Sequence, residues 1–457
     1  PKLAKPVLAL HPRGELHDTQ VDIKDGQVDC VLTRFSDLGW SGKDKYPAVS
    51  HLSGGLHWQP MEGRLELDGE NTIITPKKNP PLTLAEINAA FDWKELSSGL
   101  HINMERFILS HSDFVITAQG ALDEPFAPTR NLRLTADYSF NHAEQWLHYI
   151  PTHALKKKLE AWLKQDIKRI DKARGQLIIN GPLADFPFDK KPGDFSIVTH
   201  LSGVDLIFHK EWPLSQDIHA LLRVDKRQLN ADVFQANLIG VLVNKVNLRI
   251  DDLGLDRETL LIHGMVEAPA KKVLSYVFLS PLRTHLAKLK PLELQGALGL
   301  DLRLEVPLYP ENDDVLAKGT VTFKDNNAIF HHSLNDMELS HLSGLLEFDE
   351  HGVTDSALKG NILGDPVTIR ILSVRNKHPY TEVNIEGNTT VNVLQSKFNL
   401  PILSLMHGHL GIESKLTLTD DPTDFDHLLI SSSLEGVTID LPPPFGKSSA
   451  EKRPLPR

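Results

Sequence analysis

The chain has 457 residues, enough for two or three ordinary domains or for one elongated array. Apolar residues make up 40% of it, and the formal net charge of −11 argues against nucleic acid, which needs a concentrated basic surface. A single cysteine, Cys30, excludes an internal disulfide, so cysteine usage does not indicate the redox compartment.

Up to residue 141 the chain consists of short segments in which apolar and polar residues alternate. Period two with one apolar side is typical of half-buried antiparallel strands joined by short turns. We therefore predict a first β section over residues 1–141. Its apolar side includes Leu65, Leu67, Ile87, Phe91, Leu132 and Leu134.

Residues 142–174 carry the clearest helical pattern. Apolar residues from Leu155 to Ile170 recur at spacings of three and four, with lysines and arginines between them, and Gly175 follows as a helix stop. We predict an amphipathic basic helix that acts first as a lid with a solvated outer face. Contact with anionic headgroups is the alternative. The residues expected in this lid or membrane contact are Trp146, Tyr149, Trp162, Lys156, Lys157 and Lys158.

After the helix the alternation returns, and we predict a second β section over 175–268 and a third over 291–447. Residues 269–290 form a helical insertion that Pro281 breaks at Ser280. Residues 448–457 are a polar, flexible tail. The apolar sides of these sections include Val246, Leu248, Leu298, Leu300, Leu302, Leu304, Val306, Val321, Phe323, Val391, Val393, Leu416, Leu418, Val437 and Ile439.

A pentapeptide repeats along the chain. Residues 50–54 (SHLSG) recur as 199–203 (THLSG) and 340–344 (SHLSG), and the first and third copies continue with a similar strand–turn–strand pattern. Repeated supersecondary units are typical of a stacked, quasi-one-dimensional architecture.

The sequence offers no catalytic motif, and we expect neither an enzyme nor a cofactor. Residues 446–448 (GKS) lack the upstream glycine and the strand–loop–helix context of a phosphate loop. His407 and His409 could ligate a metal, but with 22 histidines in the chain such pairs are ordinary surface residues. The acidic turn at 420–426 lacks calcium-loop spacing. We predict no metal site.

The apolar alternation has two interpretations. Its apolar sides pack against a second sheet as a sandwich core, or they line a long open trough that holds an apolar ligand. Periodicity alone favours the sandwich, because that architecture is common.

Several phrases, in this order, are similar to the YhdP branch of the AsmA-like family of Gram-negative envelope proteins. They are WLHYIP (146–151), DFPF (185–188), EWP (211–213), SPL (280–282), VPL (306–308), LEF (346–348), GDPV (364–367), and LEGVTIDLP (434–442) with PFGK (444–447). The likeness covers most of residues 20–447.

This resemblance implies an elongated, twisted antiparallel β-sheet curled into a U-shaped groove, a repeating β-groove with two short helical insertions. It implies a lipid-transfer bridge section that carries phospholipid acyl chains across the periplasm from inner to outer membrane. The family is tied to the inner membrane by an N-terminal helix. Since this chain starts at Pro1 and has no apolar run near the roughly 18 residues that cross a bilayer, we expect that anchor outside it.

Together the resemblance and the repeat favour the trough over the sandwich. Other envelope proteins are possible partners. An envelope scaffold that binds proteins through its sheet edges stays the alternative function, and a β-rich enzyme acting on carbohydrate is the third hypothesis.

Overall fold

The computed structural model describes residues 10–42, 46–77, 79–149, 161, 163–208, 211–280, 283, 292–309, 314–331, 336–375, 379–398, 400–419 and 426–451. It is mainly β, with a few short helices. The strands are β1 (Arg13–Lys24), β2 (Gln27–Trp40), β3 (Ala48–Trp58), β4 (Glu62–Thr75), β5 (Leu82–Leu96), β6 (Gly99–Ser110), β7 (Phe114–Asp123), β8 (Asn131–Asn141), β9 (Ile167–Pro182), β10 (Asp194–Leu206), β11 (Ser215–Asp225), β12 (Gln228–Leu238), β13 (Val241–Val243), β14 (Val246–Ile250), β15 (Thr259–Pro269), β16 (Leu292–Gln295), β17 (Ala297–Pro307), β18 (Leu316–Phe330), β19 (Met337–Asp349), β20 (Gly352–Val353), β21 (Ser356–Ile362), β22 (Asp365–Val374), β23 (Tyr380–Thr390), β24 (Met406–Thr419), β25 (His427–Ser431) and β26 (Val437–Ile439). The helices are η1 (Ala143–Tyr149), η3 (Leu183–Asp185), α3 (Ala270–Phe278), α4 (Val391–Lys397) and η6 (Pro401–Leu405).

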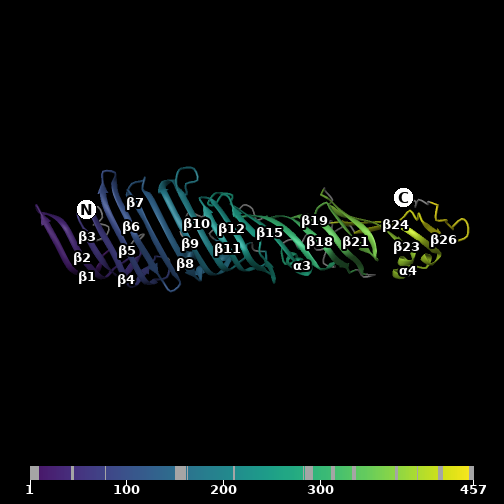
Figure 1. The fold of residues 1–457 in the computed structure, drawn as a ribbon, viewed down its shortest axis with the longest axis horizontal. Helices are drawn as coiled ribbons and strands as arrows, with labels where there is room; N and C mark the ends of the chain where they lie inside the picture. The colour runs from purple at the N-terminus through teal and green to yellow at the C-terminus, as the bar shows by residue number, and fades with distance from the viewer. Residues whose placement is uncertain are drawn as a thin grey trace.

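All these strands belong to one antiparallel sheet, in which each main strand pairs with the next along the chain. The sheet is long and narrow, its strands run obliquely to its long axis, and the two ends of the chain lie at opposite ends of it (Figure 1). Among the described residues, the first strand of the series, β1, pairs only with β2, and the last, β25, pairs only with β24. The predicted mainly β fold class and antiparallel meander are confirmed.

The predicted helical insertions do not divide the sheet. β8 pairs directly with β9 across the first insertion, and β15 pairs with β17 across the second. The three predicted β sections are therefore parts of one continuous sheet.

The predicted basic helix is wrong from Ile167 onward. β9 begins there, and Gly175, interpreted as a helix stop, pairs with Tyr138 of β8 and Thr199 of β10. Strand pairing on both sides outweighs a helical pattern in a segment that lies between β8 and β10 in the sheet. Residues 150–160 and Trp162, with Lys156, Lys157 and Lys158 among them, lie outside the described residues.

Within the second predicted insertion, α3 (Ala270–Phe278) ends with Leu279 as its C-cap, one residue before the expected break at Ser280. The strand predicted at Val391 and Val393 is wrong: both residues lie in α4. Thr390 caps this helix by accepting a hydrogen bond from the Val393 N–H at 3.3 Å. An N-cap threonine at the end of β23 starts a helix where valines alone indicate a strand.

A line of β-bulges bends the strands. In β2 the pairing to β3 skips between Phe35 and Leu38, so apolar residues three apart stay on the same face. Asp37 (φ 52°) and His51 (φ 59°) occupy the left-handed region at this bulge, and the His51 Nδ1 lies 2.7 Å from the Asp37 Oδ1. Bulges of this kind curve a sheet across its strands.

The same device explains the repeated pentapeptide. In the third copy His341 (φ 52°) contacts Asp325 (φ 62°) at 2.6 Å across the β18–β19 pair. In the second copy the histidine pairs regularly, and Gly203 (φ 65°) takes the left-handed position instead. The repeat thus encodes a bulge, and in copies one and three a left-handed histidine lies against a left-handed aspartate of the neighbouring strand.

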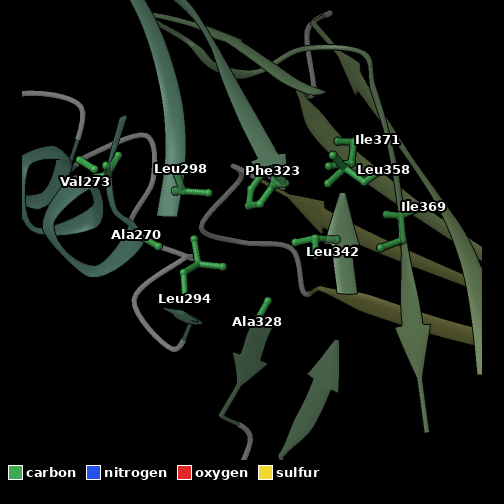
Figure 2. Packing of buried hydrophobic residues seen from close by; sticks show 11 residues of the cluster. Ala270, Val273, Leu294, Leu298, Phe323, Ala328, Leu342, Leu358, Ile369 and Ile371 are labelled. Atoms are coloured by element: carbon green, nitrogen blue, oxygen red, sulfur yellow. The ribbon is translucent and has the colours of Figure 1, made fainter. Parts of the chain in front are cut away.

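Buried apolar residues gather on one face of the sheet and under its short helices. The largest cluster joins α3 to strands β15–β22. Its members Leu298, Phe323, Leu342, Leu358 and Ile369 come from five successive main strands (Figure 2).

Candidate functional site

One face of the sheet carries continuous rows of apolar residues. Residues paired in register lie side by side on the same face, so the pairings trace each row from strand to strand. One row runs from β1 to β14: Leu16, Phe35, Gly54, Leu67, Ala89, Phe107, Ala118, Ala136, Leu177, Ile197, Val224, Leu229 and Ile250. Every member is apolar or glycine.

Because the strands run obliquely to the long axis, the first row reaches the ends of the strands before the sheet ends, and further rows continue beside it. A second runs from β7 to β20: Phe114, Phe140, Ala173, Leu201, Ala220, Val233, Val246, Gly264, Leu302, Gly319, Phe348 and Val353. A third runs from β15 to β25: Ala268, Leu298, Phe323, Gly344, Leu358, Ile369, Ile385, Ser414 and Ile430. With strands about 4.8 Å apart, the overlapping rows make an apolar path of roughly 100 Å.

The opposite face is polar. One of its rows, from β4 to β19, reads Glu70, Glu86, Ser110, Val115, Ser139, Arg174, His200, Leu221, Asp232, Asn247, His263, Arg303, Lys318 and Asp349. Cross-strand ion pairs lie on this face, such as Arg64 with Asp92 at 2.9 Å and Glu105 at 3.0 Å. The carboxylates beside Arg64, Glu66 first, raise the pKa of its guanidinium. One face of the sheet is therefore apolar, and the opposite face is polar and solvated.

The predicted lining residues on β4 to β24 all lie on the apolar face. Ile87, Leu298, Leu304, Val306 and Phe323 are buried there. The other members on these strands are partly buried: Leu65, Leu67, Phe91, Leu132, Leu134, Val246, Leu248, Leu300, Leu302, Val321, Leu416 and Leu418. Val437 and Ile439 lie on β26 and pack with Met406 and Leu410, while Val391 and Val393 lie on α4.

Short connections cover parts of this face. Ala270 and Val273 of α3 pack in one cluster with Leu298, and Phe208 and Trp212 from the β10–β11 connection pack with Leu304 and Val306. Leu300 and Leu302, between these two covered points, are only partly buried. In the described part of the chain the cover consists of such local segments, since all the strands belong to the one sheet.

The described residues of the predicted lid are those of η1, residues 161 and 163–166, and the start of β9, and Leu163 packs against the cluster of Phe208 and Trp212. Trp146 packs edge-on against Phe114, with ring centroids 4.7 Å apart, and lies 6.3 Å from Phe140. The Tyr149 hydroxyl donates to the Pro80 carbonyl at 3.3 Å, which ties η1 to the β4–β5 connection. Trp146 and Tyr149 thus pack along the edge of the apolar face.

In the described part of the chain, apolar side chains on the first and last strands of the series are exposed. On β1, Leu16 is 66% and Ile23 69% exposed, and on β25, Leu428 is 61% and Ile430 62% exposed.

The YhdP protein family model matches residues 1–456. The chain belongs to the YhdP family. This confirms the resemblance carried by the ordered phrases, and membership points to envelope lipid transport at the level of the family. No curated protein and no solved structure matches the chain. Among the residues that the structure describes, no helix has the length and apolar character to span a membrane.

Sequence reasoning missed a set of aromatic–glycine pairs on the apolar face of this YhdP-family chain. Phe35 lies across from Gly54, Trp93 from Gly63, Tyr138 from Gly175 and Phe348 from Gly319. A Cβ on any of these glycines would lie 2.1–2.7 Å from the partner's aromatic side chain. The rings therefore lie against the neighbouring backbone, and glycine inside a strand pattern is the sequence signal for such close approach.

The polar groups do not assemble a recognisable metal or cofactor site in the described residues. Asp349, Glu350 and His351 have ligand atoms within 4.8 Å of one another, but Asp349 is engaged by the guanidinium of Arg375. His407 lies 3.3 Å from Asp440 on the surface. The apolar face remains the main feature that could hold a ligand.

Proposed function

We propose that the chain carries the acyl chains of phospholipids along its apolar face, as a section of a lipid-transfer bridge that crosses the periplasm from the inner to the outer membrane. The observation that carries the proposal is the set of three overlapping rows on one face, in which every member except Ser414 is apolar or glycine. Family membership supports the same role.

The energetic reason is the cost of exposing an acyl chain to water. Moving a 16-carbon chain through water costs on the order of 0.8 kcal/mol per methylene, or roughly 12 kcal/mol per chain. A continuous apolar face removes most of that cost, while an open side leaves the charged headgroup in water. Leucine, valine, isoleucine and alanine recur along the rows, so no single position binds an acyl chain much more tightly than the next. An acyl chain can therefore slide from strand to strand.

In this proposal the protein binds and guides lipid without catalysing a reaction and without a cofactor. Its partners are phospholipid, an inner-membrane anchor outside residues 1–457, and other envelope proteins at the ends of the path. The connections that cover Leu298, Leu304 and Val306 hold the lipid against the sheet at intervals.

The test places charges on the path. In the variant Leu300→Asp with Leu302→Asp, two carboxylates enter the apolar face at its partly buried middle. We expect at least tenfold less photocrosslinking of a diazirine-labelled phospholipid, because burying an unpaired carboxylate beside acyl chains is costly. The matched control is Arg303→Asp, one residue along on the polar face. A folded double variant, checked by circular dichroism, that captures lipid as well as the control would refute the proposal.

A scaffold function is the second candidate, favoured by β1, whose side chains are all exposed and which pairs only with β2 among the described residues. A free edge can accept a strand from another protein. Native mass spectrometry distinguishes the two: phospholipid bound to the chain supports the bridge, and bound protein with no lipid supports the scaffold.

A further inference from the structure

Two tryptophans near the apolar face have a buried indole N–H without an acceptor among the described residues. They are Trp212, which is 4% exposed, and Trp146 of η1. Trp40, also partly buried, differs because its indole N–H donates to the Pro47 carbonyl at 2.9 Å.

The surroundings of Trp212 are apolar. The residue lies on the connection between β10 and β11, with its ring 5.0 Å from Phe208 and 5.9 Å from Tyr276 of α3. It belongs to one buried cluster with Ile250, Leu260, Leu304, Val306 and Leu308 from β14, β15, β17 and the segment after β17. This connection therefore reaches over the apolar face to strands that follow it by up to about 100 residues. Trp212 therefore packs over the apolar face that we propose as the lipid path.

An unpaired buried N–H is costly, and buried tryptophans normally have a hydrogen-bond partner. Phenylalanine would supply a similar aromatic surface here without that cost. The presence of the indole is explained if an acceptor reaches it from a molecule on the apolar face.

A phospholipid brings one kind of acceptor into an apolar groove. Its phosphate stays in water, but the ester carbonyl oxygens lie where the acyl chains begin and enter with them. A neutral N–H in an apolar wall suits a neutral carbonyl, whereas a charged headgroup would require a cation there.

We propose that the Trp212 indole N–H donates a hydrogen bond to the ester carbonyl of a diacyl lipid on the apolar face, and that Trp146 provides an equivalent point at η1. This rests on the proposed function and adds recognition of the ester group to it.

The test compares two lipids that differ only in this acceptor. Diester and diether phosphatidylethanolamine with the same chains compete for the purified chain against a fluorescent phospholipid. We expect the wild type to prefer the diester by roughly two- to tenfold, the range of one hydrogen bond. The variant Trp212→Phe lowers that preference, and Trp212→Phe with Trp146→Phe abolishes it. Trp40→Phe, whose indole N–H already has an acceptor, keeps the wild-type preference.

The outcomes separate the two proposals. A chain that binds neither lipid refutes the proposed function. Equal binding of both lipids by the wild type, or an unchanged preference in folded Trp212→Phe, overturns the role of the indole while leaving lipid binding intact.

If Trp212→Phe does not fold, NMR of the wild-type protein still tests the role of the indole. With ¹⁵N-labelled tryptophan, the Trp212 indole resonance should shift downfield with the diester lipid and not with the diether. Identical spectra with the two lipids overturn the inference.

Discussion

Replacing Gly54 with alanine tests whether the aromatic–glycine pairs hold the strands together. Gly54 of β3 lies between Phe35 of β2 and Leu67 of β4. A Cβ there would lie 2.0 Å from the Glu66 carbonyl oxygen and 2.7 Å from the Phe35 Cζ, and real Cβ contacts essentially never fall below 3.0 Å. The backbone of β4 and the Phe35 ring must both give way, and overpacking of this kind costs about 1–3 kcal/mol.

The neighbouring residue is the matched control. A Cβ on Gly55 meets its nearest atom, the Thr33 carbonyl oxygen, at 3.8 Å. Gly55→Ala should therefore stabilise the protein by about 0.4–1 kcal/mol, because alanine reduces the freedom of the unfolded chain. We expect the two variants to differ by about 1.5–4 kcal/mol in local stability.

A long array does not unfold in a single step, so the measurement should be local. Hydrogen-exchange mass spectrometry of peptides from β2 to β4 reports the opening free energy of these strands. At about 1.4 kcal/mol per factor of ten, Gly54→Ala should exchange at least about tenfold faster than Gly55→Ala. Equal exchange in the two variants would show that Phe35 does not depend on a bare backbone beneath it.

Three further predictions follow from other parts of the fold. Leu298→Ala should destabilise its region by about 2–5 kcal/mol by hydrogen exchange, since Leu298 is 2% exposed, whereas Leu345→Ala, 51% exposed, should change it by less than about 0.5 kcal/mol. Glu293 is the main neighbour that raises the pKa of His331 above 6.5, so the pair stabilises the fold fully below pH 6.5 and this contribution is lost as pH rises through the folded pKa. In an NMR titration, Glu293→Gln should lower the pKa of His331. An unchanged pKa would contradict the role of Glu293. Lys447→Met should cost about 1–3 kcal/mol in a denaturation profile of the C-terminal strands, because the buried ammonium donates to three backbone carbonyls that would lose their donor; a neutral result would mean other donors replace it.

The arrangement of strands and their apolar face could be predicted from the sequence, because period two survives over long stretches. Leu298 to Val306 alternate without a break, and the structure places them on one strand and one face. The bulges could not be located from the sequence, since the spacing of three between Phe35 and Leu38 is also the spacing of apolar residues on one face of a helix.

Non-local pairing explains the remaining errors. Ile167 and Ile170 fit a helical stripe, but they lie in β9. This strand pairs with β8, which ends at Asn141, and with β10, which begins at Asp194. Trp212 could not be placed on the apolar face, because the strands that it contacts follow it by up to about 100 residues and local pattern does not reach that far.

Because each antiparallel strand pairs with the one before it, the sheet has a natural unit of growth. Duplicating or deleting one hairpin changes its length by about 10 Å and returns the chain to the same edge with the same side inward. A single strand would reverse the direction in which the chain continues. Relatives of different length can therefore be spaced to different distances by whole hairpins, with the same cross-section and the same surface chemistry throughout.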